Sequence, residues 1–324
     1  MDANAHDGRY APSPTGDLHL GNLRTALAAW LIARAAGARF ALRIDDLDPD
    51  RLRPGSAERQ LADLTALGLD WDGPVVVQST RRPRHEAALA TLDEQGATYP
   101  CFCSRAEIRA AASAPHGAGV EGAYPGTCAR LAPQEAKRRV EAGEAHCTRV
   151  RAEGVVLGFT DGILGPIEGV VDDFVVRRKD GVPAYNLGTV VDDADQGVRE
   201  VVRGSDLAET THRQVWLAER LGLAVPRYAH VPIVVGVDGA RLGKRHGSVT
   251  LADLAQRGVD ADEVRLLLAE SLGIERPAGS HTGTHAGAQE LVGRFAISRI
   301  PVAEQRIDPD LLLPGVGWRD LQPL

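Results

Sequence analysis

The segment from Arg9 to Asn22 combines residue types that suit a site for a triphosphate. Its glycines, Gly16 and Gly21, permit close backbone approach to a ligand, and its prolines impose tight turns. Apolar residues at helical spacing follow, so the segment opens onto a helix whose N-terminal end favours anions. His19 stands at that junction, where phosphates are expected. The segment predicts a nucleotide-binding loop, with an ordinary turn before a core helix as the alternative.

Three of the four cysteines lie within one short stretch of the chain. Cys101 and Cys103 form a C-x-C pair, and Cys128 ends the sequence Tyr-Pro-Gly-Thr-Cys. Such clustering in an intracellular chain suggests zinc before a disulfide, and buried reduced cysteines are the alternative. Both His116 and Tyr124 could supply a fourth ligand. Chemistry alone favours the imidazole, because a phenol with a pKa of about 10 is a poor ligand unless the metal helps to remove its proton.

The chain has three lysines, Lys137, Lys179 and Lys244, among many arginines. Lys244 stands between glycines in the segment Arg-Leu-Gly-Lys-Arg-His-Gly. An ammonium on such a loop can neutralise the charge on a departing pyrophosphate in a transition state. We therefore expect Lys244 to act at a triphosphate, with a solvated surface lysine as the alternative.

These segments together resemble the class I aminoacyl-tRNA synthetases. The sequence His-Leu-Gly-Asn, which begins at His19, is similar to their first signature. The sequence Arg-x-Ala-Pro-Ser-Pro-Thr-Gly, which begins at Arg9, is similar to that of their glutamyl subgroup. The Lys244 loop resembles the second signature, Lys-x-Ser-Lys, although Arg241 replaces its first lysine and Gly243 replaces its serine.

The cysteine segment narrows the resemblance to one branch. It is similar to the zinc site of the glutamyl-queuosine tRNA(Asp) synthetases, in which a tyrosine is the fourth ligand. The resemblance therefore favours Tyr124 over His116 and implies one structural Zn²⁺. Gln-Gly-Val at residues 196–198 is also similar to this branch.

The resemblance implies which residues contact the two small substrates. Glutamate carries two carboxylates and one ammonium, so its pocket should offer two cations and one anion. Relatives resemble Arg-Ile-Glu-Asp where this chain has Arg-Ile-Asp-Asp, so Asp45 is one methylene shorter and is expected to reach the ammonium through water. The implied glutamate contacts are Arg9, Ala11, Ser13, Asp45, Tyr185 and Arg203. The implied ATP contacts are Pro12, Thr15, Gly16, His19, Gly21, Asn22 and Lys244, with His19 and Lys244 catalytic and Mg²⁺ accompanying ATP.

Hydrophobic periodicity predicts the elements that position these residues. Strands are expected at 9–11, 39–44 and 75–78, alternating with helices at 20–36, 57–67 and 84–94. This alternation predicts an α/β fold with a doubly wound, Rossmann-like parallel sheet and a ligand crevice at the C-terminal ends of its strands. Further along, we expect a strand at 170–177, a hairpin turn at Asp180-Gly181, extended chain at 184–191, helices at 211–221 and 261–272, and a flexible connection at 275–289. Cys147 begins an alternating segment and is expected in the core.

These elements suggest four segments. Residues 1–98 form the first half of the catalytic domain, 99–130 the zinc-binding insertion, and 131–235 the rest of the insertion with the second half of the catalytic domain. Residues 236–324 hold the Lys244 loop and a small helical C-terminal part. Because the chain ends about 80 residues after Lys244, we expect no anticodon-binding domain.

Composition narrows the class of protein. A net charge of −7 argues against nonspecific coating of nucleic acid, although it permits a local basic face for one RNA. The sequence shows neither a long apolar run nor a signal peptide, so we expect a cytoplasmic protein, without a membrane partner, that is a monomer.

The resemblance implies a reaction in two steps. L-glutamate is activated by ATP without tRNA, and glutamate is then transferred to the cyclopentenediol of queuosine at the wobble position of tRNA(Asp). One alternative is a truncated glutamyl-tRNA synthetase that charges a tRNA 3′ end. Another is a noncatalytic tRNA-binding paralogue. The replacements by Arg241 and Gly243 in the Lys244 loop favour this alternative.

Overall fold

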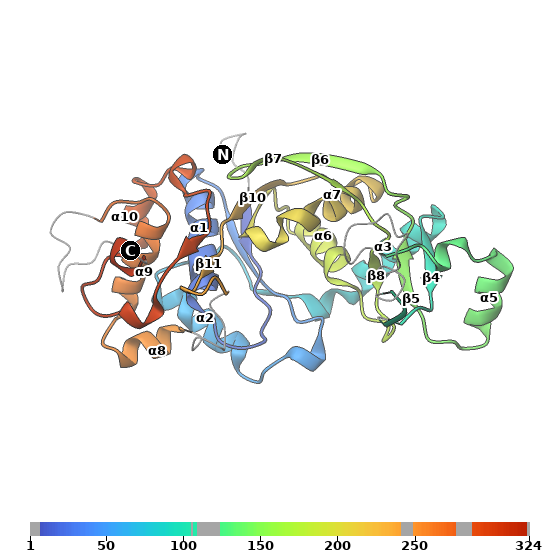
Figure 1. Ribbon diagram of the computed structural model, residues 1–324, viewed down its shortest axis with the longest axis horizontal. Helices are drawn as coiled ribbons and strands as arrows, with labels where there is room; N and C mark the ends of the chain where they lie inside the picture. The colour runs from blue at the N-terminus through green and yellow to red at the C-terminus, as the bar shows by residue number, and fades with distance from the viewer. Residues whose placement is uncertain (1–6, 105, 109–123, 241–248, 277–286, 323–324) are drawn as a thin grey trace.

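The computed structural model describes residues 7–104, 106–108, 124–240, 249–276 and 287–322. The molecule is elongated, with the large sheet between two smaller parts (Figure 1). A small sheet that carries the cysteines lies at one end, and the C-terminal helices lie at the other (Figure 1).

The large sheet confirms the predicted doubly wound architecture. Its seven strands run in the order β3-β2-β1-β9-β10-β6-β7, with bounds β1 Gly8–Tyr10, β2 Phe40–Ile44, β3 Val76–Val77, β6 Val156–Asp161, β7 Gly165–Val170, β9 Glu200–Gly204 and β10 Arg227–Val231. All neighbours pair in parallel except β6 and β7, which form an antiparallel hairpin. The chain extends the sheet from β1 toward β3 and later from β9 toward β10, so the strand order reverses between β1 and β9. Ligands of open α/β sheets bind at such a reversal.

Five helices confirm the predicted positions to within two residues: α1 Leu20–Ala35, α2 Ser56–Ala66, α3 Arg82–Glu94, α7 Thr211–Arg220 and α9 Ala261–Ser271. The first of them, α1, is buried on nearly all sides because it packs against both the sheet and α9. Trp30 lies in this core and donates its indole N–H to Asp70 Oδ1 at 2.8 Å. Helix α1 is therefore anchored in the core of the molecule.

The small sheet is antiparallel and consists of β4 Thr98–Cys101, β5 Cys147–Val150 and β8 Val175–Arg177. Helix α5, Pro133–Glu141, lies at the same end of the molecule (Figure 1). Cys147 is buried on β5, which confirms the prediction that it lies in the core. In the strand register it lies opposite Cys101 on β4. The sequence analysis did not predict that Cys147 lies next to Cys101.

The prediction of extended chain at 184–191 is wrong. Residues Tyr185–Asp195 form helix α6, which packs against α3 and α7. The run Thr189-Val190-Val191 has high strand propensity, but Leu187, Val190 and Val191 recur at helical spacing and are buried. Burial of that helical stripe overrides the local propensity.

The strand predicted at 170–177 is interrupted. Val170 ends β7 and Val175 begins β8, and Asp173 lies between them. It accepts from the backbone N–H of Ala152 and from the hydroxyl of Tyr99. The predicted hairpin turn at Asp180-Gly181 is confirmed, with Arg177 bridged to Pro183 and Gly181 at a φ of 79°.

The C-terminal part consists of α8 Leu251–Gln256, α9 and α10 Ala288–Val292, joined to the body by a two-stranded parallel sheet of β11 Val234–Val235 and β12 Gln305–Arg306. The predicted flexible connection lies mostly outside the described residues. Short 3₁₀ turns occupy Pro49–Arg51, Gln78–Arg81, Cys128–Arg130, Ser205–Thr210, Ile297–Arg299, Pro309–Leu311 and Trp318–Leu321. None of the described helices is both long enough and apolar enough to cross a membrane.

Candidate active site and cysteine cluster

Four buried charged side chains form a continuous network at the C-terminal ends of β1 and β2. Arg9 donates from Nε and Nη2 to the two carboxylate oxygens of Asp193, each at 3.2 Å. Arg43 donates to the same Asp193 at 2.6 Å and to Asp45 Oδ1 at 2.6 Å. We call Arg9, Asp193, Arg43 and Asp45 the charged network. Its two cations and two anions compensate each other.

The two carboxyl groups of the charged network differ electrostatically. Burial opposes ionisation of Asp193, but Arg9 and Arg43 outweigh burial and hold its pKa below the usual value. For Asp45 burial is the larger effect, so its pKa is raised although Arg43 opposes that shift. Asp45 follows Ile44 at the end of β2, as predicted. An ammonium placed beside Asp45 would favour its ionised form.

Arg203 lies near this network but differs from Arg9 and Arg43 because it has no carboxylate partner among the described residues. It is buried on β9, and its guanidinium bonds only to neutral groups. Those partners are His230 Nε2 at 3.1 Å, Gln214 Oε1 at 2.9 Å, Thr211 Oγ1 at 2.7 Å and Tyr185 OH at 3.4 Å. A buried cation without an anion is costly unless an anionic ligand approaches it.

Strand register places the cations on one face of the sheet. Arg9 pairs with Val201, and Arg203 follows two positions later on the same strand. Side chains two apart on a strand share a face. Helix α6 contributes to the same neighbourhood from both its ends, because Asp193 bonds Arg9 and Tyr185 bonds Arg203. Tyr185, which was expected in extended chain, therefore begins a helix and is 46% exposed.

His19 forms the N-cap of α1. Its Nδ1 accepts from the backbone N–H of Gly21 at 3.2 Å and of Asn22 at 3.4 Å, and Asn22 Oδ1 accepts from the N–H of His19. Because Nδ1 accepts, the proton of the neutral ring must lie on Nε2. Burial lowers the pKa of His19, which favours this neutral form. The ring thus offers one N–H donor beside a helix N-terminus.

The loop before His19 is fixed by backbone contacts. Gln60 on α2 donates to the carbonyls of Ser13 and Gly16, at 3.1 and 2.7 Å. The N–H of Asp45 donates to the carbonyl of Pro12 at 2.9 Å, which ties the loop to the end of β2. Gly16 has a φ of 152°, and a Cβ on Gly21 would lie 3.2 Å from the His19 ring. Of the remaining predicted contacts, Ser13 is exposed, whereas Ala11 and Thr15 are half-buried.

Lys244 and its neighbours Arg241 and Gly243 lie outside the described residues, and so does His116. The chain that follows the Lys244 loop is described, however, and it returns to His19. Val249 accepts from the N–H of Leu20 at 2.9 Å, and Thr250 forms a bridge with His19. The described chain that follows the Lys244 loop therefore meets the His19 segment at the start of α1.

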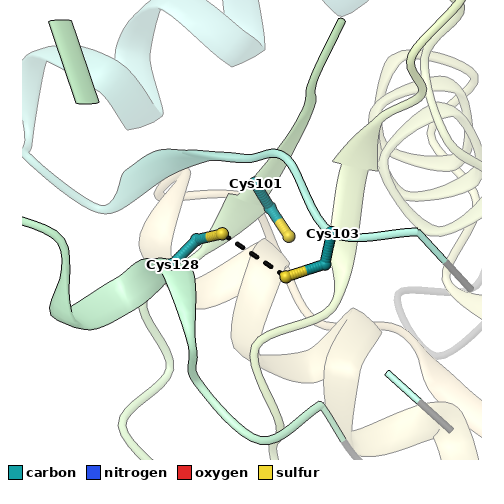
Figure 2. Close-up of side chains that lie close together, drawn as sticks. All are labelled: Cys101, Cys103 and Cys128. Atoms are coloured by element: carbon teal, nitrogen blue, oxygen red, sulfur yellow. Dashed lines mark hydrogen bonds between the residues drawn. The ribbon is translucent and has the colours of Figure 1, made fainter. Parts of the chain in front are cut away.

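The sulfur atoms of Cys101, Cys103 and Cys128 converge from three points of the chain (Figure 2). All three lie within 4.8 Å of one another, and Cys103 and Cys128 are 3.5 Å apart. A tetrahedral zinc ion with Zn–S bonds of about 2.3 Å holds its sulfurs about 3.8 Å apart. We call these three residues the cysteine cluster, and its spacing suits a metal ion.

The hydroxyl group of Tyr124 lies beside the cysteine cluster. Its hydroxyl oxygen lies 3.4 Å from Cys101 Sγ and 3.8 Å from Cys103 Sγ, and it accepts from the backbone N–H of Cys128 at 2.7 Å. Burial and the neighbouring Cys101 raise the pKa of this hydroxyl. A phenolate at this position therefore requires a cation beside it. The donor set of three thiols and one phenol oxygen fits a tetrahedral divalent metal.

Sequence reasoning missed several residues of the site. Asp193 and Arg43 were not assigned, although they hold Arg9 and Asp45 in place. Gln214 and His230, which hold Arg203, were also missed. A usable signal was the pair Asp192-Asp193 directly after the apolar run that ends at Val191, since buried acids need partners.

Comparisons with known proteins agree with this geometry. Residues 7–284 match the family described as tRNA synthetases class I (E and Q), catalytic domain. The chain is 55% identical to the glutamyl-Q tRNA(Asp) synthetase of Nocardia farcinica, over 91% of this chain and 90% of that protein. It is 47% identical to that of Symbiobacterium thermophilum, over 94% and 97%. The crystal structure of a glutamate-tRNA synthetase from Elizabethkingia anophelis superposes with a TM-score of 0.80 at 25% identity, over 95% of this chain and 69% of that one.

Proposed function

The chain belongs to the glutamyl-Q tRNA(Asp) synthetases, ligases of the class I glutamate and glutamine group, and on that premise we propose a reaction in two steps. It activates L-glutamate with ATP without tRNA, and it then transfers glutamate to the cyclopentenediol of queuosine at the wobble position of tRNA(Asp). The names of the relatives support the RNA substrate, and the charges of the pocket support the amino acid.

One observation carries the choice of glutamate. Among the described residues, Arg203 is a buried cation with only neutral partners, beside a charged network that compensates itself. Glutamate at neutral pH has a net charge of about −1. Its arrival would bring the pocket to neutrality, with one carboxylate at Arg203. Glutamine, whose net charge is zero, would leave the positive charge of the pocket uncompensated.

The first step would form a bond between the α-carboxylate oxygen of glutamate and the α-phosphorus of ATP while pyrophosphate leaves. We propose that Arg9 and Arg203 orient the carboxylates and that Asp45 receives the ammonium. The Nε2–H of His19 donates to a phosphate oxygen, and Lys244 offsets the charge that develops on pyrophosphate. Mg²⁺ enters with ATP. No covalent bond to the protein is needed, because the carboxylate is itself the nucleophile.

We propose that Cys101, Cys103, Cys128 and Tyr124 hold one structural zinc ion. The mutual distances of their donor atoms support this assignment. A structural zinc ion would cross-link β4 to the 3₁₀ turn at Cys128–Arg130 and so stabilise the end of the molecule opposite the C-terminal helices.

The test is glutamate-dependent exchange between ATP and pyrophosphate without RNA, for the wild type and for Lys244→Ala. We expect exchange in the wild type and its loss in the variant. Exchange that appears only after tRNA is added would favour a truncated glutamyl-tRNA synthetase. Absence of exchange under both conditions would favour a noncatalytic paralogue.

The position of the label in the RNA product distinguishes the two possible acceptors of glutamate. Labelled glutamate would be transferred to tRNA(Asp) that contains queuosine, and the product would be digested with ribonuclease. We expect the label on the nucleoside from the wobble position. Label on the 3′-terminal adenosine, or equal transfer to tRNA(Asp) that lacks queuosine, would contradict the proposed second step.

A further inference from the structure

Arg203 is held by a set of hydrogen bonds that leaves part of its guanidinium available. A guanidinium has five N–H donors. Four of them have partners in the described part of the chain: Nε bonds His230, Nη1 bonds Gln214 and Tyr185, and Nη2 bonds Thr211. The bond to Tyr185 is long, at 3.4 Å. One Nη2 proton and the weakly used Nη1 proton therefore remain for a carboxylate.

His230 is the partner that fixes Nε of this guanidinium. It lies on β10, directly opposite Arg203 in the strand register, and its side chain is fully buried. Its Nε2 lies 3.1 Å from Arg203 Nε, which can only donate, so Nε2 must accept. The proton of the ring therefore lies on Nδ1. A doubly protonated ring would place two donors and two positive charges against each other.

Asp161 selects this form of His230. Its Oδ2 lies 2.6 Å from His230 Nδ1, so the carboxylate accepts the only ring proton and leaves Nε2 as the acceptor. Asp161 is also buried, and its Oδ1 accepts from the N–H groups of Ile163 and Leu164 in the turn between β6 and β7. The hydrogen-bonded chain thus begins in a strand turn and ends at the guanidinium.

We propose that His230 is a positioning residue for glutamate recognition, held in one tautomer by Asp161 so that it orients the Arg203 guanidinium toward the substrate carboxylate. His230 touches no substrate atom in this proposal. The inference rests on the proposed function, in which Arg203 binds a carboxylate of glutamate. It predicts an effect on glutamate binding that is separate from ATP binding.

Two replacements of His230 separate its two nitrogen atoms. The amide of His230→Asn lies near the place of Nδ1, so it can bond Asp161 but leaves Arg203 Nε without an acceptor. The longer amide of His230→Gln reaches the place of Nε2 and can accept from Arg203. Both variants remove the ring, so a merely structural role of the imidazole predicts similar effects from the two.

The experiment measures the KM values for glutamate and for ATP in ATP–pyrophosphate exchange, with tRNA added where exchange requires it. We expect His230→Asn to raise the KM for glutamate about 10- to 100-fold, as for a lost hydrogen bond to a buried charge, with the KM for ATP changed less than about twofold. His230→Gln should stay within about fivefold of the wild type for both substrates. Calorimetry measures the affinity for glutamate without turnover and should show weaker binding in His230→Asn than in His230→Gln.

A matched control exists on another element. His85 on α3 is also fully buried and bonds an aspartate, with Nε2 at 3.0 Å from Asp192 Oδ1, but it does not contact Arg203. His85→Asn should leave the KM for glutamate unchanged. If His230→Asn does not fold, Asp161→Asn replaces it, because the amide oxygen can still accept from the turn while the choice of tautomer is lost.

The outcomes distinguish the inference from the function on which it rests. Exchange in the wild type, with the KM for glutamate unchanged in His230→Asn or raised equally in both His230 variants, would overturn the positioning role alone. Raised KM values for both substrates would also overturn it. Absence of any glutamate-dependent exchange in the wild type, with and without tRNA, would overturn both.

Discussion

The proposed glutamate pocket around Arg9 and Arg203 and the cysteine cluster satisfy their buried polar groups in opposite ways. In the charged network, two arginines and two aspartates already pair at 2.6–3.2 Å, and Arg203 has four neutral partners. In the cluster, the thiols and the Tyr124 hydroxyl have mostly long contacts of 3.4–3.8 Å with one another. The pocket is therefore preorganised by its own side chains, whereas the cluster has the spacing of a site that a metal ion organises.

The strongest test of this contrast removes the cation that the pocket leaves uncompensated. We expect Arg203→Ala to lower kcat/KM for glutamate in ATP–pyrophosphate exchange by about 1000-fold, because charge-assisted bonds to a carboxylate are lost in a desolvated site. Arg203→Lys keeps the charge but not the planar fork, so it should recover only part of this loss. An activity loss below about tenfold in Arg203→Ala would contradict the role of Arg203.

The charged network should be essential to stability as well as to binding. Arg43→Met leaves Asp45 and Asp193 buried beside too few cations, so we expect the free energy of unfolding to fall by about 3–5 kcal/mol. Urea denaturation followed by circular dichroism measures it. Arg138→Met on α5 is the control, because its pair with Glu135 is exposed and should contribute less than about 1 kcal/mol. Equal effects of the two changes would show that burial of the network is unimportant.

The cluster should affect RNA transfer more than activation of glutamate. Cys101→Ser should lower the zinc content of purified protein and reduce transfer to RNA, with ATP–pyrophosphate exchange less affected, because Cys101 lies on β4 of the small sheet whereas Arg203 lies on β9 of the large sheet. Metal analysis after dialysis and the two activity assays measure this. Cys147→Ser on the adjacent strand should retain zinc. Equal losses of exchange and transfer in Cys101→Ser would contradict the prediction that the cluster mainly affects RNA transfer.

The fourth metal ligand can be decided by one pair of variants. Tyr124→Phe removes only the hydroxyl that lies beside Cys101 and Cys103, so we expect zinc affinity to fall at least about 10-fold in competition with a chromophoric chelator. His116→Ala should have no effect. A loss of zinc affinity in His116→Ala but not in Tyr124→Phe would identify His116 as the fourth ligand.

The smallest expected effect concerns the short carboxylate of the pocket. Asp45→Glu adds one methylene and should bring the carboxylate closer to the ammonium of glutamate, which lowers the KM for glutamate by about two- to fivefold. Asp45→Asn should raise it, because the anion is lost. A higher KM in Asp45→Glu would mean that the pairing of Asp45 with Arg43 sets the spacing of the pocket.

Local patterns were sufficient to predict much of the fold. The helices at 20–35, 82–94 and 261–271 and the strands at 8–10 and 40–44 lie within two residues of the positions that hydrophobic periodicity predicted. The pattern failed for Tyr185–Asp195, where a β-branched run lies in a helix that is buried between two others. The helical spacing of Leu187, Val190 and Val191 was a local signal, but the strand propensity of the same run obscured it.

The chain order of residue types by itself determined the α/β class, the loop that ends at His19, the three converging thiols and the arginines of the pocket. Only the tertiary structure decided which charges pair with which, since Arg43 and Asp193 are 150 positions apart. It also decided that Arg203 is left with neutral partners and that His230 and Asp161 stand behind it. Residue types are encoded locally, whereas the strength and partner of a buried charge depend on strand register and on exclusion of water, which exist only in the folded chain.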